Sequence, residues 1–62
     1  MNLALVEIEL MKIIQKEPMS PAELEKVLPV PPRRLKSVLQ DLRHDGLVTR
    51  VKGTHLMALR EL

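Results

Sequence analysis

The chain has 62 residues, a net charge of +2, 45% apolar residues and no Cys, Phe, Tyr or Trp. Without cysteine it can form neither a disulfide framework nor a Cys-based zinc site, and without aromatic rings it cannot stack single-stranded bases as RRM and OB-fold proteins do. No run approaches the roughly 18 apolar residues of a membrane span and the N-terminus lacks a basic lead-in, so we expect a single cytoplasmic domain over residues 1–62 with no membrane association.

The first predicted helix spans residues 3–16, where apolar residues recur at helical spacing. Its apolar arc is wider than one core face needs, because Leu5 and Ile8 fall in or beside the polar sector. Two interpretations remain open: the small domain wraps this helix more completely, or Leu5, Ile8 and Met11 form a homodimer interface. Glu7 projects near the middle of the apolar arc, either in a frayed first turn or beside a basic partner, since an unpaired buried charge is costly.

The segment KEPMSPAELEKVLP predicts the boundary between the first two helices. Pro18 ends the first helix, because it cannot donate a hydrogen bond and disfavours helical geometry in the residue before it. Ser20 is the expected N-cap, Pro21 the first helical residue, and Glu23 completes an S-x-x-E capping box. The short helix that follows ends before Pro29. Its expected buried residues are Leu24, Val27 and Leu28.

The third predicted helix runs from Pro32 to His44 and is amphipathic. Gly46 then allows the left-handed conformation that commonly ends a helix. The runs LVTRV and HLMAL flank KGT, a pattern typical of a β-hairpin with Gly53 in its turn. The residues of this helix that are expected to face the core are Leu35, Val38, Leu39 and Leu42.

Basic charge is concentrated in the second half of the chain. Residues 33–55 hold six Lys or Arg against two Asp, whereas residues 1–32 hold three Lys against five Glu. This asymmetry indicates that an anionic partner docks on the third helix and the hairpin.

The outward stripe of the third predicted helix carries side chains suited to reading DNA. A helix in the major groove reaches base edges with such a stripe, where Arg pairs with guanine and Gln with adenine. We predict base contacts from Arg33, Ser37 and Gln40, with His44 completing the stripe. Predicted phosphate contacts, which position a protein without specifying sequence, are Arg34, Lys36, Arg43, Arg50, Lys52 and Thr54. The alternative is a solvated basic face, and Asp41 near the stripe would repel phosphate.

Two helices joined by a short turn, followed by a hairpin, describe a winged helix-turn-helix. The turn is Pro29–Pro31, with Val30 as the apolar plug. The segment SPAELEKVLPVPPRRLKSVLQDLRHDGLVTR resembles the winged-helix pattern of bacterial and archaeal transcription regulators over roughly residues 18–52. The positions that carry the resemblance are Leu24, Val30, Leu35, Leu39, Leu42, Gly46, Leu47, Val48 and Arg50. Pro31 departs from it, because it occupies the place of the usual Ser or Thr cap.

The resemblance implies an α+β, mostly α fold: a three-helix winged helix-turn-helix with a C-terminal β-hairpin wing. It also implies a small transcription regulator that binds double-stranded DNA sequence-specifically, with the recognition helix 32–44 in the major groove and the wing 47–59 on the backbone. We expect a homodimer, because one recognition helix reads only one half-site.

Other functions have less support in the sequence. The main alternative is a winged-helix protein-interaction module, such as an adaptor or accessory subunit, that does not bind DNA on its own. By length and element order the chain also resembles the winged-helix accessory proteins of bacterial ferrous-iron transport, but it lacks their cysteine cluster. A third possibility is an enzyme subunit that only orients a duplex. No catalytic constellation is evident, and His44 and His55 lack further ligands nearby, so we expect no enzyme activity, metal or cofactor.

Overall fold

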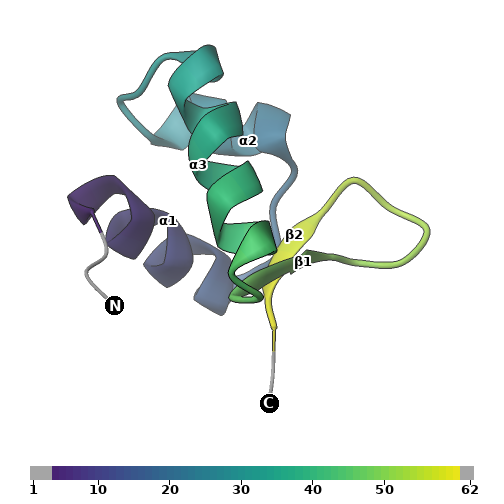
Figure 1. Cartoon of the computed structure of the whole chain (residues 1–62). Coiled ribbons are helices and arrows are strands. Elements are labelled where there is room, and N and C mark those ends of the chain that lie inside the picture. The colour runs from purple at the N-terminus through teal and green to yellow at the C-terminus, as the bar shows by residue number, and fades with distance from the viewer. Residues whose placement is uncertain (1–3, 61–62) are drawn as a thin grey trace.

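The computed structural model describes residues 4–60 as three helices followed by an antiparallel hairpin (Figure 1). The predicted fold class, mostly helical with a C-terminal hairpin wing, is confirmed. Residue 3, the predicted start of the first helix, lies outside the described residues. The elements are α1 (Leu5–Lys16), α2 (Pro21–Val27), α3 (Pro32–His44), β1 (Val48–Arg50) and β2 (Met57–Leu59).

Both ends of α1 follow from local chemistry. At its start, the Glu7 carboxylate accepts a hydrogen bond from the backbone N–H of Ala4 at 3.0 Å. The Glu7 carboxylate therefore satisfies one of the free amides at the helix terminus, and within residues 4–60 it forms no ion pair with a basic side chain. At the other end the backbone becomes extended at Glu17, just before Pro18, as the proline predicts.

The capping box of α2 is present, and the helix begins at Pro21 as predicted. The prediction that Val27 is buried is wrong, since 52% of this residue is exposed. A helix of seven residues presents only a narrow stripe to the core, and Leu24 and the C-cap Leu28 fill that stripe, both being buried. Val27 falls at its edge, on the side exposed to solvent.

The bounds of α3 are those predicted, Pro32 to His44. Pro31 precedes it in an extended conformation, without a side-chain cap, and Val30 packs against the core, as expected of the apolar plug. After the helix, Gly46 adopts a φ of +77°, the left-handed conformation predicted for it. The four apolar residues expected to face the core are all buried: Leu35, Val38, Leu39 and Leu42.

One hydrophobic cluster joins the three helices to the hairpin. Its ten members are Leu10, Ile14, Leu24, Leu28, Leu35, Val38, Leu39, Leu42, Val48 and Met57. Among the three residues predicted to form a dimer interface, Met11 is half-buried and packs against this core, so it contributes to the fold. Leu5 is 73% exposed and Ile8 37% exposed, which leaves these two on the surface of the single chain.

The wing is shorter in its strands and longer in its turn than the sequence predicts. β1 and β2 each hold three residues, with Thr49 opposite Ala58, in place of the two five-residue runs. The longer turn follows from the register: the N–H of Val51 donates to the carbonyl of Leu56 at 2.8 Å, which leaves residues 52–55 in the turn in place of KGT. Gly53 lies in this turn with a φ of +80°, as predicted.

A backbone contact that the sequence does not reveal attaches the wing to the connection between α1 and α2. The N–H of Met19 donates to the carbonyl of Met57 at 3.1 Å, and the N–H of Met57 donates to the carbonyl of Met19 at 2.7 Å. β2 therefore has β1 on one side and Met19 on the other. This bridge fixes the wing relative to the helices.

Candidate nucleic-acid interface

The face of α3 that points away from the core, called here the outer face, is exposed to solvent. Because the leucines of α3 take one side of the helix, its polar and charged residues are displaced to the other. No part of the chain between residues 4 and 60 covers these side chains, since each is exposed. They are Arg33, Arg34, Lys36, Ser37, Gln40, Asp41, Arg43 and His44.

One side of the outer face borders an open groove of about 620 Å³ between α3, α2 and β2. Pro21 and Glu25 line it from α2, and four residues line it from the outer face: Arg33, Lys36, Gln40 and Arg43. Its apolar lining includes Leu35, Leu39 and Met57. The structure thus brings together two predicted base contacts and two predicted phosphate contacts. The third predicted base contact, Ser37, is exposed but does not line the groove.

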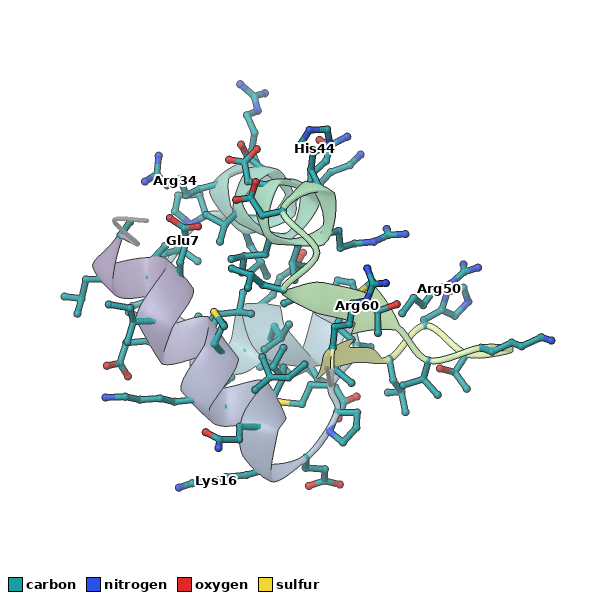
Figure 2. All side chains as sticks on the ribbon, turned by 60° about the horizontal axis from the view of Figure 1, so that its bottom comes forward. Glu7, Lys16, Arg34, His44, Arg50 and Arg60 are labelled. Atoms are coloured by element: carbon teal, nitrogen blue, oxygen red, sulfur yellow. The ribbon has the colours of Figure 1, made fainter. Side chains whose placement is uncertain are left out.

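Arg34 is separated from these residues. Figure 2 shows its side chain on the flank of α3 that faces α1, the same side as Glu7, whereas Arg50 and Arg60 lie on the other side, at the hairpin. Because Arg34 and Arg50 lie on opposite sides of α3, they would contact different phosphates if both bound one duplex. The helical wheel places Arg34 and Asp41 on the flank of the helix opposite Lys36 and Arg43, but it does not relate Arg34 to Arg50 on the hairpin.

The wing supplies the remaining predicted contacts, and one of them has a role inside the turn. The Thr54 hydroxyl donates to the carbonyl of Val51 at 2.8 Å and accepts from the N–H of Leu56 at 3.0 Å. Because a hydroxyl has a single proton, this one is not available to a phosphate oxygen. Arg50 and Lys52 are exposed at the end of β1 and in the turn, where both can reach an anionic partner.

A second hollow, a polar cleft of about 450 Å³, lies between the C-terminal half of α3 and β1. It is lined by Gln40, Arg43, His44, Val48, Thr49 and Arg60. The sequence predicts no DNA contact for Thr49 or Arg60. Strand register could have predicted their place at the cleft, because the pairing of the two strands determines which face of the hairpin each side chain occupies.

The cations of the outer face and the wing are not neutralised by neighbours. Within residues 4–60 the one ion pair, at 4.0 Å, joins Lys12 to Glu9 on α1. In the same part of the chain, no three His, Asp or Glu side chains lie close enough together to hold a metal ion. No helix described by the structure is long and apolar enough to span a bilayer. No protein-family model, curated protein or solved structure matches this chain.

Proposed function

We propose that the chain is a small transcription regulator that binds double-stranded DNA sequence-specifically in the cytoplasm, without catalysis. The observation that carries this proposal is the outer face of α3. The helix buries its leucines and leaves guanidinium, ammonium and amide groups exposed along its whole length. These groups match the donor and acceptor pattern of base edges and phosphates in the major groove.

The dimensions of α3 support this placement. Its 13 residues correspond to a rod about 20 Å long at 1.5 Å per residue. The major groove, roughly 12 Å wide, admits one α-helix. Arg33 in the first turn and Gln40 in the third lie on one side of α3, where both line the groove between α2 and α3. We assign base contacts to them and to Ser37.

Phosphate contacts are proposed for the cations around these residues, chiefly Lys36, Arg43, Arg50 and Lys52, with Arg34 on the opposite flank. All five side chains are exposed, and the ion pair of the described residues involves none of them. Their charge is therefore free to neutralise phosphates and release counterions.

We further propose a homodimer through α1. A protein with one recognition helix gains specificity by pairing two half-sites separated by about 34 Å, one turn of DNA. Leu5, which is 73% exposed, and Ile8 lie on the surface of α1, where a second copy would bury them.

A second candidate function is protein interaction, favoured by the groove between α2 and α3. Its apolar lining, which includes Leu35, Leu39 and Met57, is bordered by three cations and the single carboxylate of Glu25. This combination suits an acidic peptide with an apolar side chain. The charged backbone of a DNA duplex would gain little from contact with the apolar lining.

Titration of a fluorescently labelled random duplex at low and high salt, with light scattering of the same samples, tests the proposal. With four or five phosphate contacts per subunit, the logarithm of the binding constant should fall against the logarithm of salt concentration with a slope of about −4 for each bound subunit, and about −8 for a dimer with both subunits on the duplex. The double variant Lys36→Gln/Arg43→Gln should weaken binding, and Lys12→Gln/Lys16→Gln, which removes equal charge from α1, should not. Absence of binding at low salt would favour the protein-interaction function.

A further inference from the structure

We propose that the cleft between the C-terminal half of α3 and β1 is a phosphate-binding site formed by Arg43, His44, Thr49 and Arg60. The inference rests on the proposed function in one respect: the phosphate it assigns to the cleft belongs to the backbone of the bound duplex. It adds Thr49, His44 and Arg60 to the residues that position the DNA.

The chemistry of the cleft is that of an anion site. Its lining contains two guanidinium groups, one imidazole, one hydroxyl and one amide, and no carboxylate. Arginine presents parallel N–H groups that match two phosphate oxygens at once. Of the side chains that line the cleft, five are exposed, the exception being the buried Val48. A phosphate can therefore enter without displacing part of the core.

Strand register brings Arg60 to the cleft. The N–H of Arg60 donates to the carbonyl of Leu47 at 3.0 Å, which continues the hairpin by one pair beyond β2. Thr49 lies opposite Ala58, so Thr49 and Arg60 are diagonal neighbours on the same face of the hairpin. Both side chains are consequently directed to one side of the wing.

The Arg60 guanidinium lies beside Gly46. The Nη1 atom of Arg60 is 3.6 Å from the position that a Cβ would occupy at Gly46. Figure 2 shows the Arg60 guanidinium beside the start of β1, close to where the chain leaves α3. The Arg60 cation is thus placed at the edge of the cleft, next to the residue that ends α3.

A helix C-terminus carries partial negative charge, which by itself disfavours an anion. Here three of the last four carbonyls are occupied: those of Asp41, Leu42 and Arg43 accept hydrogen bonds from the N–H groups of Asp45, Leu47 and Gly46, respectively. Basic residues in a last turn commonly complement this dipole, and that accounts for Arg43 and His44. It does not account for Arg60, which belongs to the segment after β2.

The position of the cleft suits a backbone phosphate. Gln40 and Arg43 line both the cleft and the groove, so the cleft adjoins the outer face. Arg33 and Arg43 are separated by roughly 15 Å along the helix at 1.5 Å per residue. A phosphate held at the last turn would therefore fix how deeply the first turn enters the major groove, because backbone contacts set register.

Arg60→Gln tests the inference, with Lys16→Gln as the matched control, since Lys16 lies at the far end of α1 (Figure 2). We expect Arg60→Gln to weaken binding to specific and random duplexes alike. Because one phosphate contact contributes about 0.9 to the salt slope, the loss of affinity between 50 and 200 mM salt should become about 3.5-fold smaller for each subunit bound, or about 12-fold smaller for a dimer that loses the contact in both subunits. Lys16→Gln should leave the slope unchanged. Retained DNA binding with an unchanged slope in Arg60→Gln would overturn the cleft while leaving the proposed function intact.

A second arm omits DNA and identifies the source of the phosphate. Inorganic phosphate and pyrophosphate are titrated into the full chain, and the Thr49 amide and Arg60 Nε–H signals are followed by nitrogen-15 NMR. Saturating shifts that disappear in Arg60→Gln, without any binding of duplex, would assign the site to a free phosphate compound and reject the proposed function. A change in salt slope without such shifts would assign it to the DNA backbone. No effect in either arm would reject the cleft as a phosphate site.

Discussion

The Ser20 hydroxyl accepts a hydrogen bond from the backbone N–H of Glu23, and the Glu23 carboxylate accepts one from the backbone N–H of Ser20, both at 3.2 Å. The two residues thereby satisfy amides that a helix terminus leaves free. They also fix the first turn of α2 directly after Met19, the residue that bridges to the wing. One local pair thus sets where the helix begins and where the bridge ends.

Ser20→Ala should lower the free energy of unfolding by about 1 kcal/mol, because the N–H of Glu23 loses its acceptor. Urea denaturation followed by circular dichroism measures this change. Ser37→Ala is the control, since Ser37 is exposed in the middle of α3 and its replacement should stay within about 0.5 kcal/mol. Equal effects of the two substitutions would argue against the capping role of Ser20.

Met57→Ala should destabilise the protein by about 2–5 kcal/mol, as expected for truncation of a core methionine. Met57 is 7% exposed and belongs to the hydrophobic cluster. Met57→Leu preserves most of the volume and should cost less than about 1.5 kcal/mol. Thermal and urea unfolding of both variants provide the comparison. A small loss for the alanine variant would mean that the wing does not share the core of the helices.

Much of the fold could be predicted because its boundaries depend on local chemistry. Prolines and a capping pair set the limits of α2 and α3, and those signals lie within a few residues of each boundary. The exposure of Val27 depends on which stripe of a two-turn helix meets the core, which periodicity does not decide. The Met19–Met57 bridge joins the backbones of residues far apart in the chain, so no side-chain pattern announces it.

Arg33→Ala should weaken binding selectively at one base position, by about 1–3 kcal/mol, because a guanidinium that pairs with a base edge carries sequence information. Arg50→Ala, by contrast, should weaken binding to all duplexes alike, since phosphate contacts are the same in every sequence. Competition titrations with a set of single-base variants of the operator, once one has been selected from random duplexes, separate the two effects. Equal losses of both variants on specific and random duplexes would remove Arg33 from base reading.

Thr54→Val should destabilise the wing, because it removes the hydroxyl that bonds Val51 and Leu56. Since these hydrogen bonds are exposed, a loss of about 0.5–1.5 kcal/mol is expected on unfolding. The salt slope of DNA binding should stay the same, because the hydroxyl proton is committed within the turn. A reduced slope in this variant would restore Thr54 as a phosphate contact.

Leu5→Glu/Ile8→Glu should convert a dimer to a monomer without loss of helical signal, because both side chains are already exposed in the single chain. Val27→Glu is the control, since Val27 is 52% exposed but lies on α2. Light scattering and circular dichroism at matched concentrations measure the two properties. A dimer that survives the double substitution would place the interface away from these residues.

The candidate site was predictable where it depends on one helix and less so where elements meet. The helical wheel identified the outer face of α3, because a single periodicity separates its leucines from its polar residues. Arg60 was not predicted to contact DNA, because its place depends on the pairing of Leu47 with the segment after β2. The wheel also separates Arg34 from Lys36 and Arg43, but the element that the Arg34 flank faces depends on where α1 packs, which the sequence of α3 does not contain.

The Met19 bridge also determines which strand edge of this small sheet remains unpaired. With Met19 on one side and β1 on the other, β2 has no open edge along its bridged residue Met57. In the described residues, β1 pairs only with β2, so Val48–Arg50 presents the unpaired backbone. This edge is three residues long and ends in an arginine, features that discourage intermolecular strand addition and aggregation.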